Sequence, residues 1–465
     1  MRLVSEDVEK NPLNLPELRT RIGLFLDPKD CLSCMRVSRD WFGDFVKPVW
    51  HTIDYAKDQR FNNIGPMVLD KYGSLIKRAL NISTFEHIFS LQHPKVDSIN
   101  ALNIVLMDDW LFQELVADLI RRCKGRITDL TMLCPLSQID TVVEQRRRAR
   151  IFIHISMLMT TPMPSSASNL SHGHCLENLE LSRVCITREG FSALLQFSPV
   201  LRKIKLFKVV ILRHNPAFKV FRDSSVTYLD APMGDTLMPD PESPNSPSLL
   251  AHFPLLQKWF ITCLHRPTAW TNEAVRSEIS TQCPLLTNIR FGRHGTETLD
   301  DLLLNCTQNL KSCSFSAYKL NMSTAFACIS HLQTLTSITL EGTLRQHDSP
   351  EMQWVYFIPK LCLHLKVLSM EGLILDAKTV EDQPWTCLGL QELRVRFKGL
   401  ESNGDIAWSV TQVCDLRRAV DFTLVRLQDK DTVLSRVTLH LVQFKQLSTF
   451  WAGTKEYYLP LSPSF

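Results

Sequence analysis

An apolar pattern that recurs at nearly constant intervals constrains the fold of this chain more than any other feature. The pattern is L-x-x-L-x-L, with any apolar residue allowed at its three fixed positions, and clear copies start at Leu176, Leu201 and Leu365. A single copy carries little information, because three positions are apolar by chance about 9% of the time in a chain of this composition. The spacing is informative, since the copies between residues 176 and 390 start 24 to 30 residues apart.

A unit of 24 to 30 residues that opens with this pattern is similar to the repeat of leucine-rich-repeat proteins, and that similarity implies one short strand and one helix per unit. Side chains alternate along a strand, so the second and third apolar residues point inward and the residues between them face outward. Pro199, Pro254 and Pro284 each precede a copy and mark the end of a helix. The pattern resembles the leucine-rich repeat, and the resemblance implies an α/β protein with a horseshoe-shaped solenoid. We expect this domain over residues 70–455, with weaker copies that include those at Ile99, Ile127 and Leu434.

The segment 11–54 precedes these repeats and predicts three short helices. The first helix carries an apolar stripe of Leu18, Ile22 and Phe25. Pro28 suits the first position of a second helix, and Ser38 suits the cap of a third. About forty residues cannot bury so many apolar side chains among themselves, so we expect the segment to pack against another surface.

The order of residues in this segment closely resembles the F-box motif. The matching positions are Leu15-Pro16-Glu17, Ile22, Leu26, Asp27-Pro28-Lys29-Asp30, Leu32, Val37-Ser38, Trp41 and Trp50. The resemblance implies a three-helix F-box over residues 11–54 that docks on a Skp-type adaptor and, through it, on a cullin. The adaptor-binding residues that it implies are Leu15, Pro16, Leu26, Leu32, Val37 and Trp41. A generic helical hairpin that caps the next domain is the alternative.

Composition excludes several classes of protein. The 52 Lys and Arg residues nearly balance the 48 Asp and Glu residues, and a net charge of +4 does not suit a strongly basic nucleic-acid binder. The first ten residues include Ser5, Glu6 and Asp7, so they do not resemble a secretory leader, and no apolar run is long enough to span a membrane. The 14 scattered cysteines suit reduced thiols. We therefore expect an intracellular protein in the cytoplasm, the nucleus or both, with neither nucleic acid nor membrane as a partner.

The sequence contains no GxSxG, GxxxxGK[ST], HExxH or GxGxxG motif. The C-x-x-C formed by Cys31 and Cys34 has no second pair at zinc spacing, so helix packing is favoured over a metal site. The cluster of His172, His174 and Cys175 lacks a fourth ligand. We therefore expect no catalytic residue, no metal and no cofactor.

Two stretches interrupt the repeats. Residues 230–248 hold five prolines and four acidic residues, which predicts an exposed loop. Its Ser243-Pro244 and Ser246-Pro247 are candidate phosphorylation sites, with a plain insertion as the favoured alternative. Residues 144–150, EQRRRAR, suit a solvated helix face better than a nuclear-import or phosphate-binding patch.

The residues expected on the concave surface of the repeats include a basic, aromatic-bearing group. Its members are Lys203, Lys205, Phe207, Lys258, Phe260 and Arg290. Lysine and arginine pair with carboxylate or phosphate groups, and aromatic residues often anchor protein interfaces. We hypothesise that these residues grip an acidic or phosphorylated segment of a target protein. Ordinary solvated strand residues are the alternative.

Together, these expectations describe a non-catalytic subunit that recognises substrates for an SCF-type E3 ubiquitin ligase. The F-box would bind the adaptor and the repeats would bind an unknown target, which the ubiquitin conjugation pathway would direct to proteasomal degradation. The alternative function is a non-ligase scaffold that uses both parts only for protein–protein binding.

Overall fold

The computed structural model describes residues 13, 15–107, 109–123, 125–134, 175–212, 221–232, 248–263, 272–294, 304, 307, 309–316, 322–341, 350–376, 385–397, 441–444, 446–452 and 455–458. Most of the predicted acidic loop, the basic stretch 144–150, His172, His174 and the copy at Leu434 lie outside these residues. The chain divides into two compact units, unit 1 (Met1–Phe221) and unit 2 (Arg222–Phe465).

Unit 1 begins with the three predicted helices, α1 (Pro16–Gly23), α2 (Pro28–Cys34) and α3 (Arg39–His51). Pro16 and Pro28 occupy the first helical positions, where the missing N–H costs nothing. The hydroxyl of Ser38 caps α3 by accepting a hydrogen bond from the Trp41 N–H at 3.2 Å.

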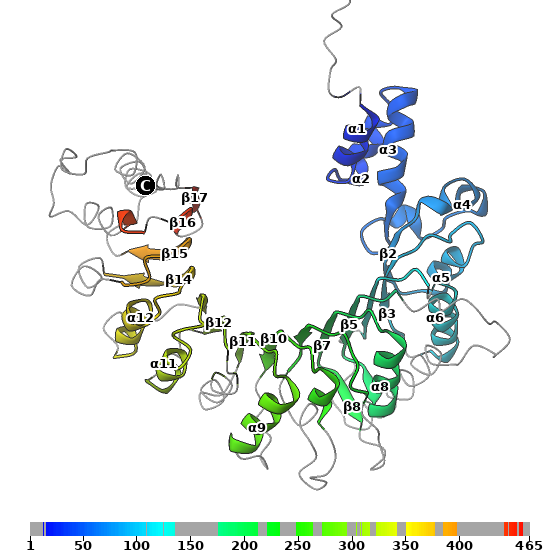
Figure 1. Ribbon diagram of the computed structural model, residues 1–465. Helices are drawn as coiled ribbons and strands as arrows, with labels where there is room; N and C mark the ends of the chain where they lie inside the picture. Colours follow the sequence, from blue (N-terminus) through cyan, green and yellow to red (C-terminus); the bar gives the residue numbers. More distant parts are fainter. Residues whose placement is uncertain are drawn as a thin grey trace, which may run out of the picture. The chain divides into compact units, whose positions relative to one another are not determined.

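The sheet of unit 1 starts directly after α3. Its parallel strands pair in the order β1 (Thr52–Asp54), β2 (Arg78–Ile82), β3 (Ala101–Val105), β4 (Asp129–Leu133), β5 (Asn178–Ser182) and β7 (Lys203–Phe207). Short strands β6 (Cys185–Thr187) and β8 (Val210–Leu212) form a separate parallel pair. Figure 1 shows the connecting helices α4 (Pro66–Tyr72), α5 (Phe85–Leu91), α6 (Trp110–Cys123) and α8 (Arg188–Phe197) along one side of these strands. We call the other side the open face of the sheet.

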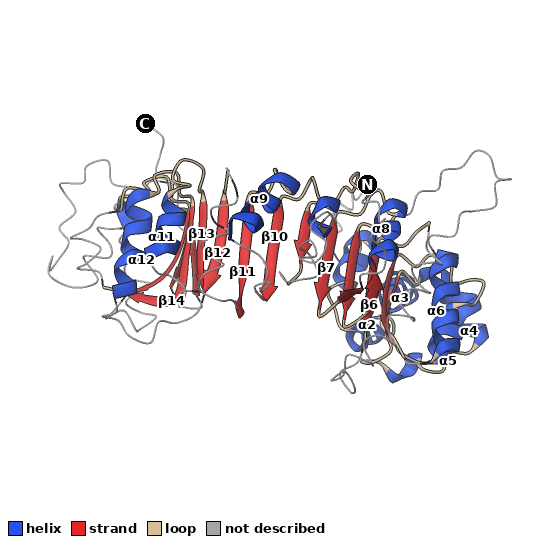
Figure 2. Cartoon of the chain, turned by 90° about the horizontal axis from the view of Figure 1, so that it is seen from below, coloured by secondary structure: helices blue, strands red, loops and turns tan. Residues whose placement is uncertain are grey.

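Unit 2 repeats the same architecture. Its parallel strands are β9 (Tyr228–Asp230), β10 (Lys258–Cys263), β11 (Asn288–His294), β12 (Ser312–Ser316), β13 (Ser337–Glu341), β14 (Val367–Leu375), β15 (Glu392–Phe397) and β16 (Thr449–Ala452), and β17 (Lys455–Tyr458) pairs antiparallel with β16. Its helices are α9 (Asn272–Gln282), α11 (Met322–Ile329) and α12 (Pro350–Leu361). Figure 2 shows β10 to β13 side by side and running in one direction.

The fixed positions of the repeat pattern form the core of both units. Leu179 and Leu181 are buried in β5, and Ile338 and Leu340 are buried in β13, whereas the residues between them face outward and are partly exposed. Each predicted copy from Ile99 to Leu390 leads into a strand. The chain is thus an α/β protein in which three helices precede a solenoid of the leucine-rich-repeat type. No helix within the described part of the chain is long and apolar enough to cross a membrane.

Candidate functional site

The three amino-terminal helices share a small core. Cys31, Phe45 and Val49 are buried, and Leu26, Leu32 and Trp41 pack against them while remaining partly exposed. The ring of Trp41 stacks on that of Phe45 with 5.4 Å between centroids. Three of the residues that the F-box resemblance assigns to adaptor binding therefore also hold the helices together.

The other three assigned residues lie at the surface. Leu15 is 52% exposed and Val37 is 63% exposed, and Pro16 is exposed at the start of α1. These are high values for apolar side chains in a folded protein. The structure therefore leaves Leu15, Pro16 and Val37 available to a partner.

The exposed apolar surface of the helices extends beyond the assigned residues. We define the helical apolar surface as Leu15, Leu18, Ile22, Leu24, Phe25, Val37 and Phe42, all of which are exposed. Phe25 is 90% exposed, the largest such value among the exposed apolar residues. The stripe of Leu18, Ile22 and Phe25 is readable in the sequence, but the resemblance alone does not assign these residues to the adaptor.

An ion pair anchors α1 to α3. The guanidinium of Arg19 lies 2.6 Å from the Asp44 carboxylate, and the exposed fractions of the two side chains are 7% and 17%. The same guanidinium donates a hydrogen bond to the Leu13 carbonyl at 2.8 Å. Five of the seven residues of the helical apolar surface lie on α1 or directly beside its ends, so this ion pair fixes the position of that part of the surface against α3.

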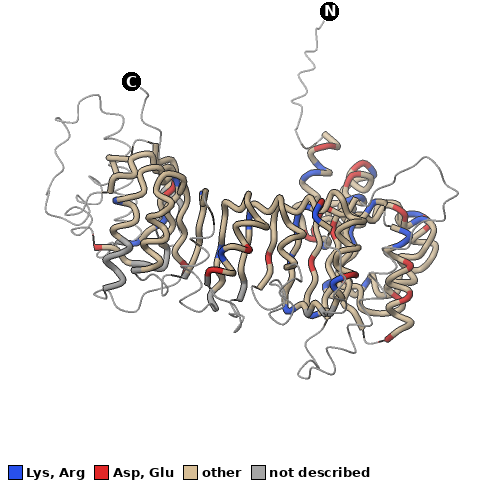
Figure 3. The backbone as a smooth tube through the Cα atoms, turned by 60° about the horizontal axis from the view of Figure 1, so that its bottom comes forward, with Lys and Arg blue, Asp and Glu red and all other residues tan. Residues whose placement is uncertain are grey.

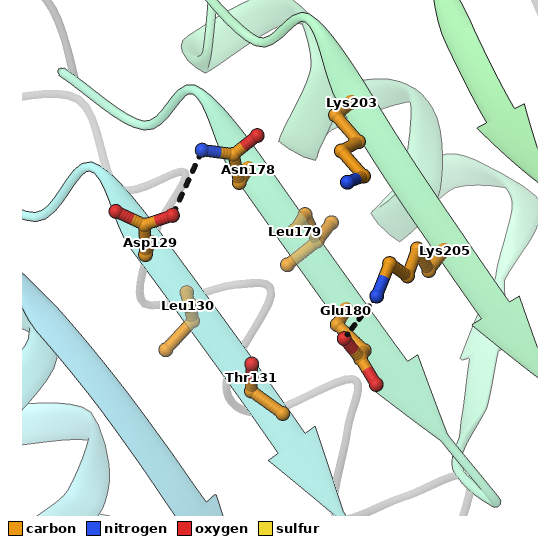
Figure 4. A pocket seen from close by; sticks show the side chains of 8 residues that line it. All are labelled: Asp129, Leu130, Thr131, Asn178, Leu179, Glu180, Lys203 and Lys205. Carbon is orange, nitrogen blue, oxygen red and sulfur yellow. Dashed lines mark hydrogen bonds and ion pairs between the residues drawn. The ribbon is translucent and has the colours of Figure 1, made fainter. Parts of the chain in front are cut away.

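A second candidate site is a hollow of about 220 Å³ on the open face of unit 1. It is lined by Asp129, Leu130, Thr131, Asn178, Leu179, Glu180, Lys203 and Lys205 (Figure 4). Strand register places Asp129, Asn178 and Lys203 in one row across the sheet. Thr131, Glu180 and Lys205 form the next row. Two predicted target-binding residues, Lys203 and Lys205, therefore lie in one hollow.

Both carboxylates in the hollow are held by neighbours. Asp129 accepts hydrogen bonds from the Asn178 side-chain amide at 2.8 Å and from the Thr128 hydroxyl at 2.7 Å. The Lys205 ammonium lies 3.1 Å from the Glu180 carboxylate. Two carboxylates thus balance the two lysines, and the formal charge of the hollow is zero. Figure 3 likewise shows acidic and basic residues interspersed along unit 1.

Phe207, the third predicted residue of this group, is exposed at the end of β7. The side-chain cations of Arg183 and Lys208 each lie 5.8 Å from its ring centroid. This distance suits a cation–π contact, so the ring has cationic neighbours on the protein itself.

The remaining predicted target-binding residues lie together in unit 2. Lys258 and Phe260 are on β10, and Arg290 on β11 pairs with Phe260 in the strand register. The guanidinium of Arg290 lies 4.9 Å from the Phe260 ring centroid and 2.9 Å from the Glu341 carboxylate. Ser314 donates to the same carboxylate oxygen at 3.0 Å. Arg290 therefore already contacts the Phe260 ring and the Glu341 carboxylate before any target binds.

The described residues contain no group of three or more His, Cys, Asp and Glu side chains that could hold a metal ion. The Cys31 thiol donates a hydrogen bond to the Gly23 carbonyl at 3.3 Å. Burial raises the pKa of this thiol above its ordinary value, and Cys34 and the nearby acidic residues add to the effect. Cys31 is therefore a packing group that stays protonated at neutral pH.

Comparisons with known proteins add no family to this description. No protein-family model and no curated protein matches the chain.

Proposed function

We propose that this chain is the substrate-recognition subunit of an SCF-type E3 ubiquitin ligase. Its amino-terminal helices would bind a Skp-type adaptor, and its repeats would bind a target protein. The observation that carries the proposal is the helical apolar surface, which lies on helices whose sequence resembles the F-box. Seven large apolar side chains exposed on one short helical segment favour a protein-binding role for it.

The energetics favour a docking role for this surface. Burying one large aliphatic or aromatic side chain contributes about 1.5–3 kcal/mol. Leu15, Phe25 and Val37 are each more than half exposed, so a partner gains this contribution from several residues at once. The Arg19–Asp44 ion pair keeps α1 in place, which reduces the entropy that the helix loses on binding.

The repeats provide a second, separate kind of surface. Rows of polar and charged side chains cover the open face in unit 1, as Asp129, Asn178 and Lys203 show. A chain that holds an adaptor on one surface and a target on another contributes proximity to a reaction that other subunits carry out. No catalytic group of this chain is required.

The test is co-purification of the tagged full-length chain with an adaptor and a cullin. We expect Leu15→Ser combined with Val37→Ser to lose both partners, because both side chains are exposed and their replacement leaves the helical core intact. Trp41→Ala is a poorer test, since Trp41 stacks on Phe45 and its loss would also loosen the helices.

The matched control is Leu255→Ser combined with Leu285→Ser. These leucines of unit 2 are exposed to a similar degree as Leu15 and lie in turns before strands. The control should retain both partners. Recovery of adaptor without cullin would favour the non-ligase scaffold, and recovery of neither partner by the unaltered chain would refute the proposal.

A further inference from the structure

The hollow on the open face of unit 1 has two halves of opposite charge. The carboxylates of Asp129 on β4 and Glu180 on β5 form the acidic half. The ammonium groups of Lys203 and Lys205, both on β7, form the basic half (Figure 4). A ligand that crosses the strands therefore meets negative charge on one side and positive charge on the other.

We infer that this hollow binds an extended segment of a partner protein that carries one basic and one acidic side chain about three residues apart. The inference deepens the proposed function, because this segment would belong to the target. The basic side chain contacts Asp129 and Glu180, and the acidic side chain contacts Lys203 and Lys205.

The spacing follows from sheet geometry. Strand β5 lies between β4 and β7, so Asp129 and Lys203 are two strand spacings apart, or about 10 Å. An extended segment in the polyproline II conformation rises about 3.1 Å per residue with three residues per turn, so two side chains three residues apart leave the same side of the segment about 9 Å apart.

Asp129 and Lys205 retain hydrogen-bonding capacity for a ligand. Each Asp129 carboxylate oxygen accepts one of the two bonds described above, and a carboxylate oxygen can accept a second. The Lys205 ammonium has three N–H donors, and among the described residues it donates to the Glu180 carboxylate alone. A ligand can therefore contact Asp129 and Lys205 without breaking the hydrogen bonds described for these two residues.

Segments of uniform charge fit the hollow less well. A second acidic side chain would lie against Asp129 and Glu180, and a second basic side chain would lie against Lys203 and Lys205. Like charges at such distances repel, and both groups would lose hydration. The balanced charge of the hollow therefore selects for a segment with a mixed pair.

The test uses the full-length chain and fluorescent synthetic peptides of about nine residues on a serine-glycine background. One peptide carries an arginine and an aspartate three residues apart, and the others carry two arginines, two aspartates or no charge. The mixed peptide can form two exposed ion pairs with the hollow, and each such pair contributes a fraction of a kcal/mol. We therefore expect the mixed peptide to bind about fivefold tighter than the others at low salt. A preference for either uniformly charged peptide, equal binding, or no binding at about 1 mM peptide would overturn the inference.

Charge-reversal variants provide a stricter test. Lys203→Glu with Lys205→Glu should shift the preference to the doubly basic peptide, and Asp129→Lys with Glu180→Lys should shift it to the doubly acidic peptide. The control Lys95→Glu changes an exposed lysine that does not line the hollow and should keep the preference for the mixed peptide. Thermal melting checks that each variant is folded. If a double variant is unfolded, Lys203→Gln replaces it, and we expect this variant to show a smaller loss of the preference for the mixed peptide.

Adaptor binding is measured on the same preparations. Adaptor binding by an unaltered chain that shows no preference for the mixed peptide would overturn this inference and leave the proposed function intact. A preserved preference in a chain that binds no adaptor would refute the proposed function and leave the charge-paired hollow in place.

Discussion

Asn178 on β5 donates its side-chain amide to the carboxylate of Asp129 on β4 at 2.8 Å, although 49 positions separate the two residues in the chain. They are neighbours because they occupy the same register position in adjacent repeats. The bond holds the Asp129 carboxylate on the open face, beside the lysines of β7 (Figure 4). Equivalent positions in successive repeats thus assemble a site from residues that are far apart in sequence.

Asn178→Ala should weaken this arrangement. Removing the amide donor costs about 1 kcal/mol of unfolding free energy, because the Asp129 carboxylate loses one of its two hydrogen bonds. Urea denaturation followed by circular dichroism measures the loss. Asn288→Ala in unit 2 is the matched control, since the side chain of Asn288 shows no hydrogen bond within the described part of the chain. Equal losses in both variants would contradict the role assigned to the bond.

Asp44→Ala should detach α1 from α3. Arg19 would keep its hydrogen bond to the Leu13 carbonyl but lose the carboxylate that balances its buried charge, which typically costs about 3–5 kcal/mol. We expect faster hydrogen exchange of the α1 amides and loss of adaptor binding. Asp118→Ala is the control, because the Asp118–Arg121 pair is exposed on both sides and such pairs contribute about 1 kcal/mol or less. Unchanged exchange in α1 after Asp44→Ala would disprove the anchoring role.

The L-x-x-L-x-L pattern predicts the strands in which the apolar residues keep its spacing. It misses strands in which that spacing changes. In β2, Asn81 has a φ of 58°, and an irregular register pairs Ala79 with Leu102 and Ile82 with Ile104. The extra residue separates the inward-facing positions by three instead of two, so L-x-x-L-x-L does not match. Strand β16 follows Leu447, and Leu447, Phe450 and Ala452 form a copy of the pattern that is not among the predicted ones.

Side-chain partners across repeats are harder to predict than strands. The sequence predicts Arg290 on the concave surface of the repeats, but Glu341 lies 51 residues further along and reaches Arg290 only once β11, β12 and β13 are aligned. Asp129 is likewise not among the predicted binding residues, which are all basic or aromatic. It lies beside Lys203 and Lys205 only because the strand register aligns β4, β5 and β7. Phe25 belonged to a predicted apolar stripe, and its near-complete exposure depends on tertiary packing.

Gly23→Ala and Gly43→Ala should have opposite effects on the amino-terminal helices. A methyl group at Gly23 would lie 2.5 Å from Cγ of Pro48, so α1 and α3 must move apart, at a cost of about 1–3 kcal/mol. At Gly43, inside α3, nothing lies within 4 Å of the new methyl group. Alanine there stabilises the helix by about 0.5–1 kcal/mol. Thermal melting should show a lower melting temperature for Gly23→Ala and a higher one for Gly43→Ala. A lower melting temperature for Gly43→Ala would contradict the prediction.

Unit 1 should lose stability as the pH falls through the range in which histidine titrates. His87 is buried, its ring stacks on Tyr55 with 3.9 Å between centroids, and it accepts a hydrogen bond from the Ser83 N–H at 3.2 Å. Burial lowers the pKa of His87 from its ordinary value of 6.5, and the Glu86 carboxylate offsets this only in part. The unfolded chain therefore binds more protons than the folded chain below pH 6.5, so the free energy of unfolding falls with pH.

His87→Asn should reduce this pH dependence, since asparagine can accept the bond from Ser83 without taking up a proton. We expect the fall in melting temperature between about pH 7.5 and about pH 5.5 to be smaller in this variant than in the unaltered chain. Part of the fall should remain, because burial, together with Arg78 and Lys77, also lowers the pKa of His51. His364→Asn replaces an exposed histidine and serves as the control. If both variants keep the full pH dependence, the buried neutral state of His87 does not contribute to the stability of the protein.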